Sequence, residues 1–227
     1  MTLRRRTVLA GAAALAAPAF GSPALAKPAV TRIPLADAFL LLDYYLALKP
    51  AERDRFYPAY RAVRDKKPTA DVSARIVHRD GTSTPLALDA GGWVTELPTL
   101  DQLKRRDSFE VDGAPFDFSL EMRARVAPAE RLAAGELTAA LAQVNAALVS
   151  FAGGDSSAVG RLTCIYFPDA VAGRAVMADG SERPLPTFDF PLIGVTPYLE
   201  TGKLPAPTAV ALTKPPSRIL LAGPPRK

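Results

Sequence analysis

Residues 80–86 read Asp-Gly-Thr-Ser-Thr-Pro-Leu, and residues 179–185 read Asp-Gly-Ser-Glu-Arg-Pro-Leu. An Asp-Gly pair favours a two-residue β-hairpin turn, because both central positions of that turn need positive φ. Residues 72–78, before the first turn, alternate with the period of a strand, and residues 172–178 precede the second turn in the same way. The sequence therefore predicts two similar β-hairpins, 99 positions apart.

The same offset pairs similar residues well beyond the hairpins. The pairs are Leu42 with Leu141, Tyr45 with Val144, Val94 with Ile193, Pro98 with Pro197, Leu100 with Leu199, Asp101 with Glu200, Val111 with Val210, Leu120 with Ile219, and Met122 with Leu221. Self-similarity at a fixed offset is the signature of a repeated structural unit. We therefore predict two tandem units of similar architecture.

Each unit is predicted to begin with a helix. Apolar residues recur at helical spacing in 36–48 and in 136–151, while residues 51–64 fit either a helix or an extended stretch. Strands are predicted at 72–78, 85–89, 93–97, 108–111, 116–126, 162–167, 172–178, 208–212 and 217–221. The predicted fold class is α+β, with two tandem similar units, each a helix followed by an antiparallel β-sheet with an Asp-Gly hairpin.

The boundaries of these units follow from the element order. We place the first α+β unit at residues 27–126 and the second at residues 135–223. Residues 127–134, which include Pro128, are the predicted linker, and residues 224–227 are a loose tail.

Residues 1–26 predict a cleaved signal peptide. Three arginines, Arg4 to Arg6, precede an Ala-rich apolar run at 8–20, and Ala24-Leu25-Ala26 predicts cleavage after Ala26. The segment Arg5-Arg6-Thr7-Val8-Leu9 resembles a twin-arginine export motif, and an ordinary secretory signal is the alternative. The apolar run is shorter than the about 20 residues that span a bilayer. We expect a periplasmic protein with no transmembrane segment in the mature chain.

Charge and cysteine content narrow the partners further. The chain holds 28 Lys and Arg and 23 Asp and Glu, and three of the basic residues lie in the predicted signal. The remaining net charge of +2 gives no reason to expect a nucleic-acid partner, and the basic clusters at 64–67 and 104–106 are predicted to be solvated. Cys164 is the only cysteine, so we predict a buried small hydrophobe and no intrachain disulfide.

The single histidine, His78, removes most familiar catalytic and metal sites. A zinc site of His and Cys needs several such ligands, and a Ser-His-Asp triad would have to use His78 without a Gly-x-Ser-x-Gly motif. Asp80 is two residues away, which is not triad geometry, so we predict a core or core-rim histidine. Residues 153–157 follow a helix and lack the Lys of a phosphate-binding loop, so they predict a plain connector.

Carboxylates and aromatic residues leave two further patterns. Asp80 and Asp179 are explained by turn chemistry. Three acidic residues could meet in a groove, namely Glu96, Asp101 and Glu121. Five aromatic residues could line a groove but fit a hydrophobic core better, namely Tyr44, Tyr45, Trp93, Phe116 and Phe118. We therefore predict no catalytic, cofactor-binding or metal-ligating residue, and no cofactor.

The order of these elements is similar to that of an exported proteobacterial family that carries a domain of unknown function. The resemblance is carried by Pro85-Leu86-Ala87-Leu88, by residues 92–98 (Gly-Trp-Val-Thr-Glu-Leu-Pro), and by Asp179-Gly180. It implies a periplasmic location and carries over no catalytic residue. This chain departs from the resemblance in its single cysteine, where related chains can hold a pair.

Two functions from different classes remain open. The first is a non-enzymatic periplasmic binding or envelope-assembly factor, which takes a protein or small ligand in a groove between its units or at a sheet edge. The alternative is a hydrolase or lyase that acts on an envelope polymer through paired carboxylates. The two are distinguished by whether two carboxylates converge in a concave pocket.

Overall fold

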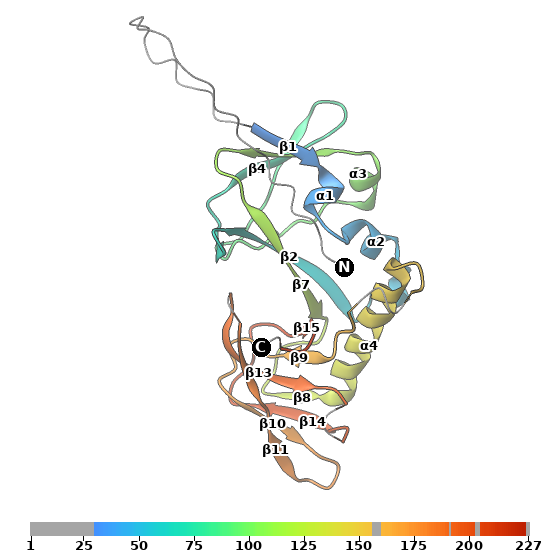
Figure 1. Ribbon diagram of the computed structural model, residues 1–227, viewed down its shortest axis with the longest axis vertical. Coiled ribbons are helices and arrows are strands. Elements are labelled where there is room, and N and C mark those ends of the chain that lie inside the picture. The colour runs from blue at the N-terminus through green and yellow to red at the C-terminus, as the bar shows by residue number, and fades with distance from the viewer. Residues whose placement is uncertain (1–29, 156–159, 191, 203–204, 226–227) are drawn as a thin grey trace, which may run out of the picture.

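Strands dominate the computed structural model, which describes residues 30–155, 160–190, 192–202 and 205–225 (Figure 1). Of these residues 38% lie in strands and 19% in helices, so the predicted α+β class is wrong. The predicted signal peptide lies outside the described residues. In chain order the elements are β1 (Val30–Pro34), α1 (Leu35–Ala38), α2 (Leu42–Ala47), a 3-10 turn (Pro50–Glu52), β2 (Phe56–Arg64), β3 (Lys67–Pro68), β4 (Ser73–Val77), β5 (Ser83–Pro85), α3 (Leu100–Lys104), β6 (Ser108–Asp112), β7 (Asp117–Ala124), β8 (Arg131–Ala133), α4 (Ala134–Phe151), β9 (Cys164–Tyr166), β10 (Gly173–Val176), β11 (Glu182–Pro184), β12 (Thr187–Phe190), β13 (Gly194–Glu200), β14 (Ala209–Leu212) and β15 (Leu220–Ala222).

The described strands form three antiparallel sheets. A seven-stranded sheet has the order β12-β13-β9-β15-β7-β2-β3. Two four-stranded sheets have the orders β1-β6-β4-β5 and β8-β14-β10-β11. Figure 1 shows one small sheet toward each end of the molecule, with β2, β7, β15 and β9 between them.

The predicted succession of a helix and then its own sheet, repeated in tandem, is wrong because strands from both parts of the chain build one sheet. β7 pairs with β15, with Met122 opposite Leu221 and Arg123 opposite Leu220. A period-2 pattern predicts a strand but does not say which strand becomes its neighbour. Residues 131–133 of the predicted linker form β8, which is an edge of one small sheet.

The registers also correct one predicted residue pair. Val111 of β6 lies opposite Ala74 of β4, whereas the residue opposite Gly173 of β10 is Leu212. Position 173 stands 99 residues after position 74, so Val111 matches Leu212 and not Val210. A fixed offset fails here because β14 lies two positions farther along the chain than that offset predicts.

The helices agree with the sequence pattern in part. α4 confirms the helix predicted at 136–151, and it buries Leu137, Leu141 and Val144. The helix predicted at 36–48 is broken into α1 and α2 by Leu41, whose φ is 68°. The break lets both Phe39 and Leu42 be fully buried.

Residues 56–64 settle the ambiguity of the segment 51–64 in favour of a strand, β2. Alternate residues of β2 are buried, from Phe56 to Ala62. Residues 93–97 do not form the predicted strand and make only isolated bridges, between Arg61 and Trp93 and between Leu88 and Val94. Cys164 is fully buried in β9, as predicted. None of the described helices is long and apolar enough to cross a membrane.

The turn at Gly92 docks against β2 and needs a glycine for two reasons. Its φ is +79°, and a Cβ there would lie 2.3 Å from the carbonyl oxygen of Thr69. Gly81 has a similar φ of +87°, but a Cβ there would meet nothing within 4 Å.

We therefore expect Gly92→Ala to lower the free energy of unfolding by roughly 2–4 kcal/mol, because strain and a backbone clash add. Gly81→Ala should lower it by only about 1 kcal/mol, the cost of positive φ alone. Urea denaturation of both variants measures the difference. Equal losses would show that the contact between the turn and Thr69 is absent.

Glu110 holds together three strands of the first small sheet. It is 7% exposed in β6, and it pairs with Arg32 of β1 and with Arg75 of β4, whose Nη2 lies 2.6 Å from Oε2. Burial raises the pKa of Glu110, but the hydrogen bonds from Arg32 and Arg75 outweigh it, and the net pKa is lowered.

A lowered pKa in the folded state means that this stabilisation is present above the unfolded value of 4.5 and is lost as the pH falls through the folded value. We expect the free energy of unfolding of the wild type to fall more steeply below pH 4.5 than that of Glu110→Gln. Urea titrations between pH 7 and about pH 3 measure both slopes. If the free energy of unfolding had the same pH dependence in both proteins, the stabilising role of the ionised Glu110 would be contradicted.

Candidate functional site

Trp93 is positioned by the turn that precedes it. The Oδ1 of Asp89 accepts hydrogen bonds from the backbone N–H groups of Gly91 (2.8 Å) and Trp93 (2.9 Å). The turn is joined to β2 because Ala62 N–H donates to the carbonyl of Gly92 (2.8 Å). These bonds hold the indole over one face of the seven-stranded sheet.

Three guanidinium groups surround the indole ring of Trp93. The Cζ atoms lie 3.8 Å (Arg123), 4.9 Å (Arg61) and 5.4 Å (Arg218) from the ring centroid. Arg61 belongs to β2 and Arg123 to β7, and Arg218 lies two residues before β15. A cation over an indole face is favourable, and more so where water is excluded. We call these three arginines with Trp93 and Glu121 the arginine cluster.

Glu121 of β7 is the carboxylate that accepts hydrogen bonds from two of these arginines. Its Oε2 accepts from the Nε of Arg123 (2.9 Å) and of Arg218 (3.0 Å), and its Oε1 accepts from the Nη2 of Arg218 (3.2 Å). The side chains of Glu121, Arg123 and Arg218 are only 12–16% exposed. The Nη2 of Arg123 is buried and lies 2.9 Å from Glu121, yet makes no hydrogen bond among the described residues.

The cluster carries an excess of positive charge. Arg61 donates its Nε–H to the carbonyl of Gly91 (2.8 Å) and makes no salt bridge within the described chain. Burial is the largest cause that lowers the pKa of Arg61, and the charges of Arg218 and Arg123 lower it further against the opposing charges of Glu121 and Asp89. Three cations thus lie near two carboxylates, Glu121, which is bonded to Arg123 and Arg218, and Asp89, so that one positive charge is in excess.

An apolar cavity of 260 Å³ adjoins the cluster. It lies where β7 and β15 meet the hairpin of β12 and β13, and Glu121 lies in its wall. The other lining residues are Ser119, Leu120, Met122, Phe190, Leu192, Ile193, Leu220, Leu221 and Ala222. Glu121 therefore belongs both to the apolar cavity and to the arginine cluster.

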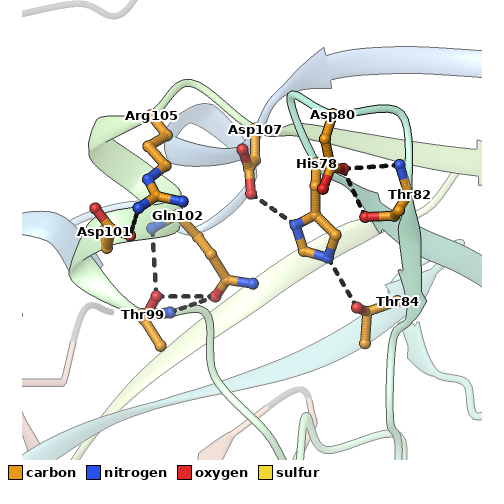
Figure 2. A network of polar contacts seen from close by, with 9 residues as sticks. All are labelled: His78, Asp80, Thr82, Thr84, Thr99, Asp101, Gln102, Arg105 and Asp107. Carbon is orange, nitrogen blue, oxygen red and sulfur yellow. Dashed lines mark hydrogen bonds and ion pairs between the residues drawn. The ribbon is translucent and has the colours of Figure 1, made fainter.

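His78 lies in a second polar network, at the end of β4 (Figure 2). Its Nδ1 is 2.8 Å from the Oδ2 of Asp107, and its Nε2 is 2.8 Å from the Oγ1 of Thr84. Asp107 is 3% exposed. The pairing of Val77 with Ser108 places His78 beside Asp107, so the residues meet across two strands.

The predicted role of Asp80 as a turn residue is confirmed, and it is not the partner of His78. Its Oδ1 accepts from the N–H (2.9 Å) and Oγ1 (2.6 Å) of Thr82. Asp179 makes the same two bonds to Ser181, at 2.9 and 2.6 Å. The side-chain hydrogen bonds of Thr82 and Ser181 lower the pKa of the respective aspartates.

The three other acidic residues do not converge. Asp101 pairs with Arg105 (2.8 Å) on α3, Glu121 lies in the arginine cluster, and Glu96 is exposed in a loop. Within the described residues no group of three His, Cys, Asp or Glu is placed to hold a metal ion. Of the connector predicted at 153–157, residues 156 and 157 lie outside the described part.

The aromatic residues divide between the core and the surface. Phe116 and Phe118 pack with Phe109, and Tyr45 packs with Phe56, as predicted for core residues. Tyr44 is 52% exposed. The sequence gives no sign that three arginines gather around Trp93, because they come from β2, β7 and the residues before β15, which are far apart in the chain.

Comparison of the chain with protein-family models, with curated proteins and with solved structures finds no match.

Proposed function

We propose that the chain is a periplasmic binding protein that holds a small anionic ligand with an apolar body in the cavity between β7, β15 and the β12–β13 hairpin. The single observation that carries this proposal is the excess positive charge of the arginine cluster, whose Glu121 lies in the wall of that cavity. Buried charge is costly unless it is paired. An anionic group supplies the missing countercharge.

The chemistry of the cluster favours a carboxylate or a phosphate. A guanidinium group offers a planar fork of N–H donors that matches two oxygens of such an anion. Arg61 lies opposite Ser119, which lines the cavity, and among the described residues only its Nε donates a hydrogen bond, so its other donors can engage the anion. The apolar wall of Phe190, Leu192 and Ile193 suits the hydrocarbon part of the ligand.

The size of the cavity limits that ligand. Typical small-molecule pockets are about 300–1,000 Å³, and 260 Å³ lies just below that range. A chain of about six carbons or a single ring suits this volume. The predicted hydrolase that uses paired carboxylates has no support here, since Glu96, Asp101 and Glu121 stay apart.

Binding should depend on both halves of the ligand. Hexanoate and hexyl phosphate should raise the melting temperature and give measurable heats of binding, and hexanol should bind at least tenfold more weakly. Arg61→Gln should weaken hexanoate binding by roughly tenfold without unfolding the protein. Isothermal titration calorimetry measures each value.

The matched control is Arg174→Gln, which removes an exposed arginine of β10 that is paired with Glu182. Its affinity for hexanoate should equal that of the wild type. Binding of hexanol as tight as that of hexanoate, or an Arg61→Gln variant with unchanged affinity, would contradict the proposal.

The location rests on the three-part order of residues 1–26 and on the resemblance to an exported family. We expect the protein in the periplasmic fraction, shortened at Ala26. Replacing Arg5 and Arg6 together by Lys should retain the precursor in the cytoplasm if the route is twin-arginine export. Fractionation and immunoblotting measure the distribution. Unshortened wild-type protein in the cytoplasm would contradict the location, and export of the Lys-Lys variant would assign the ordinary secretory route.

A further inference from the structure

We propose that Thr84, His78 and Asp107 form a second site that hydrolyses small carboxylic esters, with the Thr84 hydroxyl as the nucleophile. The site lies in the first small sheet and shares no residue with the cavity of the proposed binding function. The proposed esterase site can therefore be tested independently of the proposed binding function.

The three side chains have the mutual geometry of a nucleophile, a base and an orienting carboxylate. When the neutral imidazole of His78 carries its proton on Nδ1, it donates to Asp107, and Nε2 is then an acceptor that faces the Thr84 hydroxyl. Both contacts are 2.8 Å. Activation of a hydroxyl by an adjacent base, itself held by a third group, is the general pattern of covalent acyl transfer.

Solvent exposure increases from the orienting carboxylate to the base and then to the nucleophile. The side chain of Asp107 is 3% exposed and that of His78 is 22% exposed, while Thr84 lies on the exposed strand β5. The buried carboxylate fixes the imidazole, and the hydroxyl remains accessible to a substrate. A hollow of 600 Å³ lies beside this network, with His78, Thr82, Gln102, Arg105 and Asp107 in its wall.

Gln102 supplies a donor for the oxyanion that would form. Its side-chain carbonyl accepts from the N–H of Thr99 (2.8 Å), which fixes the amide. Figure 2 shows the Gln102 amide nitrogen on the side that faces His78, and within the described chain it makes no hydrogen bond. A fixed amide donor of this kind stabilises the charge of a tetrahedral intermediate.

The second hairpin argues that the network is not needed to build the fold. There Met177 N–H donates to the carbonyl of Ser181 (2.8 Å), as His78 N–H donates to that of Thr82 (2.8 Å). Gly180 and Gly81 close the two turns with equal bonds of 3.0 Å. The second hairpin forms these bonds with Met177 and Arg183 at the places of His78 and Thr84. Backbone bonds of this kind thus do not require a histidine network.

The chemical steps balance without any co-reactant other than water. Oγ1 of Thr84 bonds to the ester carbonyl carbon while its proton passes to Nε2 of His78. His78 then gives this proton to the leaving alkoxide as the C–O bond breaks, and an acyl-threonine remains. Water attacks that ester with His78 as base, which releases the acid and restores the hydroxyl.

The test is hydrolysis of p-nitrophenyl acetate by the purified protein. Thr84→Val keeps the shape of the side chain without its hydroxyl, and it should lower kcat/KM by at least about 100-fold. Thr84→Ser should retain activity within tenfold of the wild type. Mass spectrometry of protein treated with a fluorophosphonate should locate the label on residue 84. Asp107→Asn should lower kcat and shift the pH profile.

Ser83→Ala is the matched control on the same strand and should leave kcat/KM unchanged. Thermal melting confirms that each variant is folded. Imidazole alone can cleave this activated ester, so a Thr84→Val variant that keeps full activity while His78→Gln loses it would overturn the proposal. A folded wild type with neither turnover nor label on residue 84 would overturn it as well.

Discussion

The pairing of β7 with β15 is the contact on which the rest of the structure depends. Its register places Met122 opposite Leu221, and it makes one seven-stranded sheet from strands that lie on both sides of α4 in the chain. One face of this sheet buries Phe56, Tyr60 and Ile165 in the main core with the helices. The pairing also closes the wall of the apolar cavity, because residues 119–122 and 220–222 line it together.

The opposite face of the same sheet explains why charge and apolar surface meet. Arg123, Leu220 and Tyr166 lie directly opposite one another on three successive strands, so they share that face. Toward β9 it is a small apolar cluster of Cys164, Tyr166 and Leu220, and toward β2 it is the arginine cluster. The boundary between the two regions is where the proposed ligand, an anion with an apolar body, would contact both the arginines and the apolar surface.

Local chemistry was predictable from the sequence, and pairing was not. The two Asp-Gly hairpins, α4 and the burial of Cys164 follow from short-range preferences and periodicity, and they are confirmed. The predicted two-residue turn is wrong, because only Gly81 and Gly180 have positive φ and three residues separate His78 from Thr82 and Met177 from Ser181. The segment 51–64 could not be assigned because Phe56, Tyr57 and Tyr60 fit a helix face as well as a strand. Likewise, the predicted fold class was wrong because a period-2 pattern does not indicate which strands pair with each other.

The candidate sites show the same limit more sharply. His78 and Asp107 are 29 residues apart, and only the register of β4 with β6 brings them together. Asp80, the nearest acid in sequence, is taken by its own turn. Similarly, Arg61 and Arg218 meet over Trp93 only because β2, β7 and β15 are neighbours in one sheet.

Native-state amide hydrogen exchange tests the central claim, a single sheet joined through β7 and β15, most directly. If the pairing holds, the amides of β2, β7, β9 and β15 will open together, with the free energy of global unfolding. Exchange of the β9 and β15 amides at a clearly lower free energy than those of β2 and β7 would show two independently unfolding parts, and would contradict the account.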